Sequence, residues 1–246
     1  MELRGLRHVF PDDKAALDGV DLSIQAGTFV VLAGRNGSGK TVLMRHLNGL
    51  ARPTSGEVLL EGCPVLDDLQ GARRRIGLVF QDADAQIVGQ TVARDAAFGP
   101  ENLRLPRTVI RERVKAALEA TGLVGFDERR PHTLSGGEKR RLAVAGVLAM
   151  NPDILVLDEP FTGLDWPGCA ALLEVLDRFH TSGKTVLVIT HDLDKVLAHA
   201  DRLIMMDEGR IRADGPPSDV VDHVGRWGVR RPSGPITGMS WKRERP

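Results

Sequence analysis

The sequence of 246 residues has little cysteine, no net charge and no long apolar run. Cys63 and Cys169 lie far apart, with no C-x-x-C pair and no nearby histidine cluster, so a structural zinc site is not supported and reduced thiols are expected. The 33 basic and 33 acidic residues cancel, which argues against a general nucleic-acid-binding surface. Apolar runs reach about five residues, far below the ~20 of a spanning helix, and the first residues do not resemble a signal peptide. We therefore expect a protein that does not itself cross a membrane.

The stretch 225–246 departs from this balance of charge, because six basic residues face one acidic residue. The charged residues are Arg226, Arg230, Arg231, Lys242, Arg243, Arg245 and Glu244. Two interpretations are open: a disordered tail, which we favour, or a segment that touches anionic lipid or a partner protein.

A glycine-rich motif near the N-terminus carries the strongest functional signal. It consists of Gly34, Arg35, Asn36, Gly37, Ser38, Gly39, Lys40 and Thr41 and fits the pattern G-x-x-x-x-G-K-[ST]. An apolar run precedes it at 29–33, and helical spacing of Leu43, Met44, Leu47 and Leu50 follows it. Backbone N–H groups of such a loop cradle phosphates, Lys40 would reach the β- and γ-phosphates, and the Thr41 hydroxyl would bind Mg²⁺. The alternative is a glycine-rich turn that binds nothing, and it is disfavoured by this context. The sequence predicts a nucleoside triphosphate site.

Two carboxylates follow a buried strand later in the chain. The four apolar residues 154–157 are typical of a central strand of a parallel sheet, and Asp158 and Glu159 come directly after them. Beside a phosphate loop, Asp158 would hold the metal ion and Glu159 would act as general base on the attacking water. A solvated strand end is the alternative. A second buried run, 185–190, is followed by His191. A lone histidine is more often structural than catalytic, but ligands bind at this edge of open α/β sheets, so we expect His191 near the γ-phosphate.

Two further features leave alternatives open. Phe10 could stack on a base or could be a core or hairpin aromatic, and spacing alone does not decide. Ser135, Gly136, Gly137 and Glu138 stand before a helical pattern. There the backbone amides could meet a phosphate, or the serine could be an ordinary N-cap. Residues 91–151 have helical composition and interrupt the strand pattern, so we predict a helical insertion.

These motifs, in this order, resemble the ATP-binding-cassette (ABC) ATPases from about Leu3 to Val224. The resemblance implies an α/β phosphate-loop NTPase fold of RecA-like type, with a mostly parallel sheet, an antiparallel β edge and an inserted helical subdomain. It implies a catalytic core at 1–90 and 152–224, the helical subdomain at 91–151 and a tail at 225–246. ATP and Mg²⁺ would be bound. Phe10 would stack on adenine, and Gln81 would contact Mg²⁺ and couple hydrolysis to a partner.

The resemblance also implies that two subunits close head to tail around two ATP molecules. Ser135 to Glu138 would then cover the γ-phosphate bound by the other subunit, and Asp165 would link the two sites. Three positions depart from the common pattern of the family. They are Glu138 in place of glutamine, Arg35 in place of proline, and Thr162-Gly163 in place of a Ser-Ala pair. None of them removes a group that the chemistry needs.

A narrower resemblance is to the ATPase subunits of energy-coupling factor importers, of the cobalt, nickel or biotin type. It rests on the segments 79–88, 97–102 and 135–141. It implies a peripheral protein at the cytoplasmic face of the membrane, paired with a second copy or a related ATPase, and docked on integral membrane subunits. We expect that docking near Gln81 and Gln86–Asn102.

Two other classes of protein fit the sequence less well. A soluble ABC ATPase acting on nucleic acid or ribosomes would usually carry a long coiled-coil arm or two cassettes, and here Lys40 and Ser135 are only about 95 residues apart. The zero net charge also disfavours nucleic acid. A regulator that binds nucleotide without turnover is disfavoured by the presence of Glu159 and His191.

Overall fold

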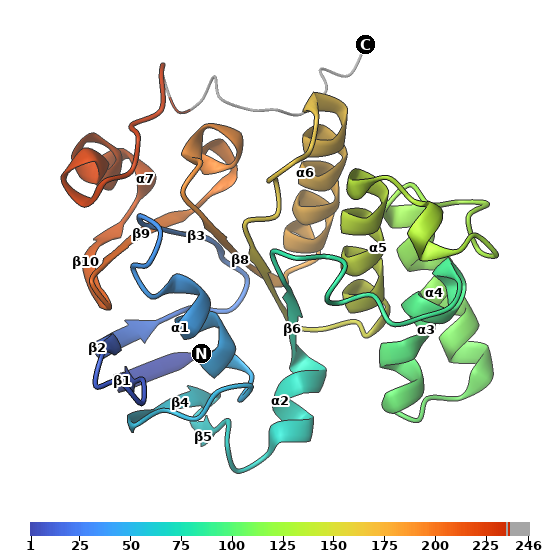
Figure 1. The fold of residues 1–246 in the computed structure, drawn as a ribbon, viewed down its shortest axis with the longest axis horizontal. Coiled ribbons are helices and arrows are strands. Elements are labelled where there is room, and N and C mark those ends of the chain that lie inside the picture. The colour runs from blue at the N-terminus through green and yellow to red at the C-terminus, as the bar shows by residue number, and fades with distance from the viewer. Residues whose placement is uncertain (235, 237–246) are drawn as a thin grey trace.

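The computed structural model describes residues 1–234 and 236, which form two sheets and surrounding helices (Figure 1). The strands are β1 (Glu2–Val9), β2 (Ala15–Ser23), β3 (Phe29–Ala33), β4 (Ser55–Leu60), β5 (Cys63–Pro64), β6 (Ile76–Val79), β7 (Ile154–Asp158), β8 (Thr185–Thr190), β9 (Arg202–Asp207) and β10 (Arg210–Gly215). The helices are α1 (Lys40–Leu47), α2 (Leu69–Arg75), α3 (Val92–Asn102), α4 (Arg107–Ala120), α5 (Gly136–Ala149), α6 (Trp166–Thr181) and α7 (Pro217–Val220). Short 3-10 segments are η1 (Pro131–Thr133), η2 (Leu193–Lys195), η3 (Leu197–His199) and η4 (Val221–Trp227).

The larger sheet has the strand order β10-β9-β3-β8-β7-β6, and all its neighbouring pairs are parallel except β9 and β10. The smaller sheet, β2-β1-β4-β5, is antiparallel. The predicted fold class, a mostly parallel α/β core with an antiparallel edge, is therefore confirmed. In the parallel register Ala33 pairs with Thr190, and Asp158 pairs with Ile189. This register brings the ends of β3, β8 and β7 to one edge of the sheet, where the phosphate loop begins.

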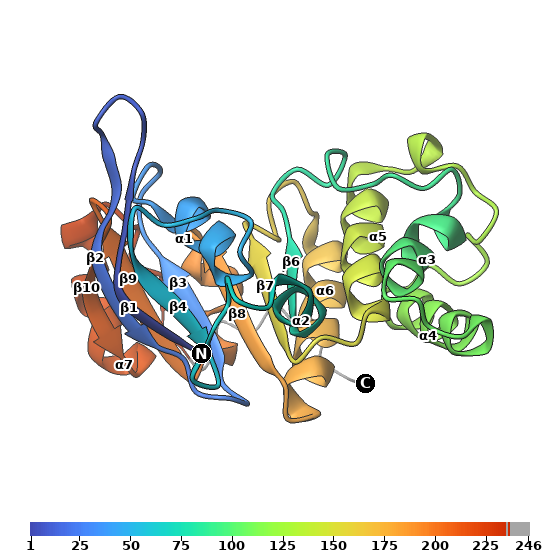
Figure 2. The same cartoon turned by 90° about the horizontal axis from the view of Figure 1, so that it is seen from below.

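The helix after the phosphate loop lies between the two sheets (Figures 1 and 2). Its buried residues Leu43, Met44 and Leu47 share a hydrophobic cluster with Leu17 of β2 and Leu32 of β3. The opposite face of the large sheet is covered by α6 and by part of α5, and every residue of β3, β7 and β8 is buried. Burial on both faces explains why these strands read as continuous apolar runs. Helix α1 ends at Leu47, so Leu50, expected on its apolar face, lies beyond the helix and is 49% exposed.

Helices α3, α4 and α5 form a separate group at one side of the molecule (Figure 2). They have their own hydrophobic cluster, which includes Val92, Leu118 and Leu142. All three helices fall within the span 91–151 that the sequence marks as a helical insertion. In the part of the chain that the structure describes, no helix combines the length and the apolar character needed to cross a membrane.

The chain remains packed past position 225, where the sequence suggested the start of a tail. Segment η4 runs across this position, and Val224 and Val229 are buried in the main core. Trp227 and Ile236 pack against the same core. The basic residues Lys242, Arg243 and Arg245 lie outside the described residues.

Two buried histidines predict how stability depends on pH. His46 of α1 is 2% exposed, and the His199 side chain is 7% exposed. Burial lowers the pKa of both from the ordinary value of 6.5. Below about pH 6.5 these histidines are protonated in the unfolded chain but stay neutral in the folded chain. The free energy of unfolding therefore falls as the pH drops from 6.5 toward the folded-state pKa values. Each group contributes up to about 1.4 kcal/mol per pH unit in that window.

Urea denaturation at pH 7.5, 6.5 and 5.5 measures this loss. The variant His199→Asn removes one of the two groups, and its unfolding free energy is expected to fall less steeply with decreasing pH than that of the wild type. Equal slopes in the two proteins would contradict the assignment to His199.

Candidate active site

A cavity of about 430 Å³ lies between the phosphate loop and the carboxyl ends of β7 and β8. Its size suits a small ligand. It is lined by Phe10, Lys14, Ala15, Ala16, Asn36, Gly37, Gly39, Lys40, Thr41, Val42, Gln81, Asp158, Glu159, Thr162 and His191. Most residues that the sequence assigned to ATP and metal binding therefore meet around one space. The exceptions within the loop are Gly34, Arg35 and Ser38, which are not among the lining residues.

The phosphate loop is held closely from behind. A Cβ on Gly34 would come within 2.1 Å of the backbone oxygen of Met206, so only glycine fits at this position. Gly37 and Gly39 have positive φ angles of 80° and 101°, which L-residues rarely adopt. The Ser38 carbonyl accepts a hydrogen bond from Gly209 N at 3.0 Å. The pattern of glycines thus follows from close packing and backbone shape.

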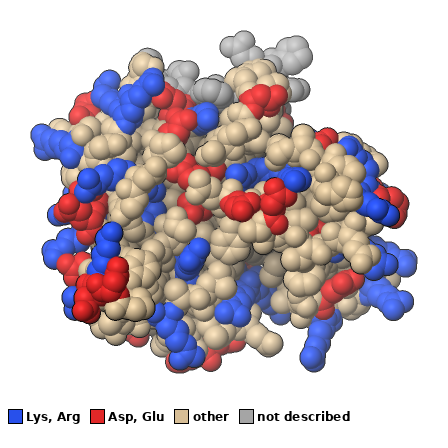
Figure 3. Space-filling view, viewed as in Figure 1, with Lys and Arg blue, Asp and Glu red and all other residues tan. Residues whose placement is uncertain are grey.

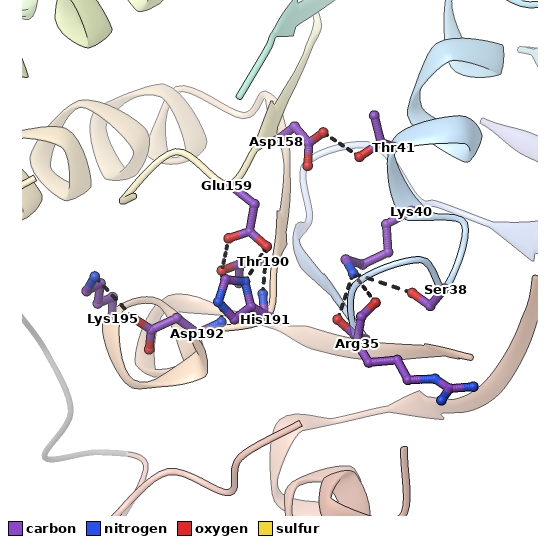
Figure 4. A network of polar contacts seen from close by, with 11 residues as sticks. Arg35, Ser38, Lys40, Thr41, Asp158, Glu159, Thr190, His191, Asp192 and Lys195 are labelled. Carbon is purple, nitrogen blue, oxygen red and sulfur yellow. Dashed lines mark hydrogen bonds and ion pairs between the residues drawn. The ribbon is translucent and has the colours of Figure 1, made fainter. Parts of the chain in front are cut away.

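Lys40 is the cation inside the loop (Figure 4). Its Nζ donates to the backbone oxygens of Gly34 and Arg35 at 2.6 and 2.9 Å, and lies 3.4 Å from Ser38 Oγ. Burial lowers the pKa of Lys40, while the nearby Glu159 and Asp158 carboxylates act in the opposite direction. Three oxygen acceptors surround the ammonium group and hold it in place. The loop is therefore closed around its own lysine.

Thr41 and Asp158 meet from opposite sides of the cavity. Thr41 Oγ1 donates to Asp158 Oδ2 at 2.7 Å, joining the first turn of α1 to the end of β7 (Figure 4). Asp158 is 2% exposed. This burial raises the pKa of the Asp158 carboxyl.

Glu159 is fixed by three hydrogen bonds at the end of β8. Its carboxylate accepts from Thr190 Oγ1 at 3.0 Å and from the backbone N–H of His191 at 3.0 Å. The His191 Nδ1 lies 2.6 Å from Glu159 Oε1. Glu159 is 7% exposed, whereas the His191 side chain is 54% exposed and borders the cavity. Thr190 was missed by the sequence reasoning, although its place as the last residue of a buried strand, next to His191, was the available signal.

Phe10 stands at the mouth of the cavity, in the turn between β1 and β2, and is 40% exposed. Its ring meets the His8 ring edge to face, with centroids 5.1 Å apart. His8 Nδ1 in turn lies 3.2 Å from His46 Nε2 on α1. Phe10 is therefore an exposed aromatic at the cavity with lateral support. No sequence motif marks His8 or His46.

The Ser-Gly-Gly-Glu segment lies outside this cavity. Ser135 is the N-cap of α5, and with Glu138 it forms a capping box: Ser135 N donates to Glu138 Oε2 at 2.7 Å, and Glu138 N donates to Ser135 Oγ at 3.3 Å. The backbone N–H of Ser135 lowers the pKa of the Glu138 carboxyl. Asp165 is the N-cap of α6, and its Oδ1 accepts from Gly168 N at 2.9 Å. Both segments have a structural role within this chain.

Helix α5 is also tied to the segment after β6. The Arg140 Nη1 donates to the backbone oxygen of Phe80 at 2.9 Å, one residue before Gln81. Lys139 Nζ forms an ion pair with Asp84 at 2.6 Å. The start of α5 and the segment around Gln81 are therefore connected directly.

The fold and this cavity define a phosphate-loop ATPase, because a glycine loop with its lysine faces paired carboxylates at the ends of parallel strands. The chain belongs to the ABC transporter family, whose profile matches residues 17–162. It is 44% identical over 227 residues to the energy-coupling factor transporter ATP-binding protein EcfA of Methanocaldococcus jannaschii, an alignment that covers 91% of this chain and 81% of that protein.

Solved structures agree with this assignment. CbiO1 from Clostridium perfringens, described as part of the ABC transporter complex CbiONQ, superposes with a TM-score of 0.81 and 36% identity over 90% of each chain. A bacterial ABC transporter cassette described as dimeric superposes with a TM-score of 0.80 and 28% identity, over 88% of this chain and 98% of that one. The resemblance to ABC and energy-coupling factor ATPases and the predicted ATPase activity are confirmed.

Acidic and basic side chains are mixed over the face of the molecule shown in Figure 3. A protein surface that binds the phosphate backbone of a nucleic acid would instead have its positive charges clustered in one patch. The comparisons likewise favour the importer ATPase over a nucleic-acid ATPase.

Proposed function

We propose that this chain hydrolyses ATP to energise import of a small substrate through separate membrane subunits of an energy-coupling factor importer. The observation that carries the proposal is the cavity itself. It joins Lys40 and Thr41 from one side to Asp158, Glu159 and His191 from the other. We further propose that the substrate is a vitamin such as biotin, or a cobalt or nickel ion, following the narrower resemblance of the sequence.

The phosphate loop would bind the β- and γ-phosphates of ATP. Backbone N–H groups and the N-terminus of α1 offer partial positive charge at this end of the cavity. Lys40 would turn from the carbonyls of Gly34 and Arg35 to the phosphate oxygens. Phe10, exposed at the mouth, offers a flat face for the adenine ring.

The residues Thr41, Gln81 and Asp158 fit a Mg²⁺ ion, because each offers an oxygen ligand of the kind Mg²⁺ prefers. Thr41 Oγ1 and Asp158 Oδ2 are already 2.7 Å apart, and Gln81 lines the same cavity. When bound, the ion would offset the negative charge of the phosphates. A cation beside Asp158 would also favour its ionised form, against the effect of burial.

Glu159 would act as the general base. Its carboxylate accepts hydrogen bonds from Thr190 Oγ1, His191 N and His191 Nδ1, and these three bonds fix its direction. It would orient the attacking water and accept its proton. His191, half exposed at the cavity, would contact the γ-phosphate.

Two copies of the chain would complete each site. The N–H groups at the start of the 14-residue helix α5 do not face the cavity of their own chain. We propose that Ser135, Gly136, Gly137 and Glu138 cover the γ-phosphate bound by the second copy, or by a related ATPase, and that Asp165 links the two sites. The dimeric cassette among the similar structures supports this arrangement. ATP would favour the closed pair, and hydrolysis would reopen it.

The membrane subunits would dock on the segment 86–102, with the ATPase at the cytoplasmic face of the membrane. Val88 and Phe98 support this surface, because they are 60% and 51% exposed. Charged replacements, Val88→Glu with Phe98→Glu, are expected to reduce capture of the membrane subunits at least tenfold, since an unpaired charge buried in an interface is costly. ATP hydrolysis by the isolated protein should stay within twofold of wild type.

The matched control is Val124→Glu, which changes an apolar residue of similar exposure, 67%, outside the segment. It should capture the membrane subunits as wild type does. Equal capture by all three proteins would place the docking surface elsewhere.

An affinity pull-down from detergent-solubilised membranes of the source organism tests the function as a whole. Co-purification of hydrophobic membrane subunits is the expected result, and the substrate-binding subunit among them would identify the cargo. Recovery of ribosomes or nucleic acid, and of no membrane protein, would contradict the importer proposal.

A further inference from the structure

The Arg35 side chain leaves the active-site cavity although its backbone belongs to the phosphate loop (Figure 4). Its Nε donates to Asp207 Oδ1 at 2.7 Å, and its Nη2 donates to Glu208 Oε1 at 3.1 Å. Both carboxylates stand at the turn between β9 and β10. The Asp207 side chain is only 15% exposed, whereas that of Arg35 is 51% exposed. The positive charge of Arg35 is thus matched by two carboxylates outside the cavity.

The same turn supports the loop at two other points. Gly209 N donates to the backbone oxygen of Ser38 at 3.0 Å, and the Met206 oxygen packs directly against Gly34. The aliphatic stem of Arg35 is covered by Gly228, where a Cβ would lie 3.5 Å from the Cβ of Arg35. The loop is therefore held from behind by the β9–β10 turn.

These outer contacts gain importance when phosphate binds. In this structure Lys40 ties the loop from inside, through the carbonyls of Gly34 and Arg35. A lysine that turns to a phosphate oxygen gives up those bonds, whereas the outer contacts from β9 and the β9–β10 turn remain. A site whose donors are held in place before binding loses less entropy on binding.

We propose that Asp207 is a positioning residue for nucleotide binding, acting through Arg35 on the shape of the phosphate loop. The proposal rests on the assignment of this loop to ATP phosphates made above. Arg35 then links the phosphate loop to the β9–β10 turn and does not bind the phosphates.

The test compares Asp207→Asn, Arg35→Ala and the double variant in ATP titrations and steady-state hydrolysis. Each single change is expected to raise the Kd and KM for ATP about fivefold, the scale of a good exposed ion pair. The double variant should be no worse than Arg35→Ala alone, because that single change already removes the contacts of Arg35 with both Asp207 and Glu208. The kcat at saturating ATP should stay within twofold of wild type, since the catalytic carboxylate is untouched.

Additive losses would overturn the proposal. So would tighter ATP binding by Asp207→Asn with weaker binding by Arg35→Ala, because that pattern assigns the Arg35 charge to the phosphates. An unchanged Kd in all variants would also overturn it. Arg35→Lys keeps a cation within reach of the carboxylates and should retain most of the affinity, which gives a second measurement if Arg35→Ala folds poorly.

Arg202→Ala is the matched control, because Arg202 pairs with Asp214 on the same hairpin and does not contact the phosphate loop. Its ATP affinity should equal that of the wild type. If wild type neither binds nor hydrolyses ATP, the proposed function fails. If it does both, and only the variant pattern differs, the positioning role alone fails.

Discussion

Replacing Glu159 with glutamine is expected to reduce ATP hydrolysis at least 100-fold while leaving ATP binding within a few-fold of wild type. General-base catalysis contributes about 10²–10⁴-fold, and an amide cannot accept the proton of water. Glutamine keeps the size of the side chain and can still accept from Thr190 Oγ1 or from His191 N, so the loop after β7 should retain its shape. Single-turnover hydrolysis and ATP titration separate the two quantities.

The control is Glu174→Gln, an exposed carboxylate on α6 far along the helix from its N-cap. Its turnover should match that of wild type. If Glu159→Gln still hydrolysed ATP at more than a tenth of the wild-type rate, Glu159 would not be the base. A loss of ATP binding in the same variant would instead mean that Glu159 contributes to ATP affinity.

The second large effect is expected from Gly34→Ala. The new methyl group would lie 2.1 Å from the Met206 oxygen and 2.7 Å from Ser38 Oγ, so the loop or β9 must shift. Overpacking of this kind costs about 2–3 kcal/mol, and in a chain of this size that lowers the Tm by roughly 4–12 °C. Because the displaced atoms belong to the phosphate loop, ATP affinity should fall at least tenfold as well.

Gly225→Ala provides the comparison, since neither glycine has a positive φ and a Cβ at Gly225 meets nothing within 4 Å. That variant should keep both the Tm and the ATP affinity of wild type. Thermal denaturation and nucleotide titration of the two variants measure the difference. An unchanged Tm in Gly34→Ala would mean that the backbone at Met206 can move away from the new methyl group with little loss of stability.

The sequence predicted the centre of the fold better than its edges. The runs 29–33, 154–157 and 185–190 are buried on both faces in the structure, and burial leaves an unbroken apolar pattern that can be read directly. Helix α2 was not predicted, because it is only seven residues long and buries Ala72 alone. Leu50 was placed on α1 by spacing, but the helix ends three residues earlier.

In the site, too, some residues could be predicted from the sequence and others could not. Motif residues were found because each has a fixed offset from a glycine or a strand end, as with Lys40 and Asp158. Their supports were missed because they come from distant parts of the chain: Arg35 contacts Asp207, which is 172 residues away. No local pattern records a contact of that separation. The catalytic and binding roles of these residues remain predictions until the variants above are measured.

The attachment of α5 to the segment around Gln81 has a mechanical consequence. Arg140 and Lys139 fix the first turns of the helix to Phe80 and Asp84, and a capping box closes its end at Ser135. Lys139 and Arg140 lie in the first two turns of α5, only four and five residues from Ser135. A displacement of residues 80–84 would therefore be passed directly to Ser135. Under the proposed function, docking of a membrane subunit near Gln81 and closure over the ATP of a second copy are then expected to occur together.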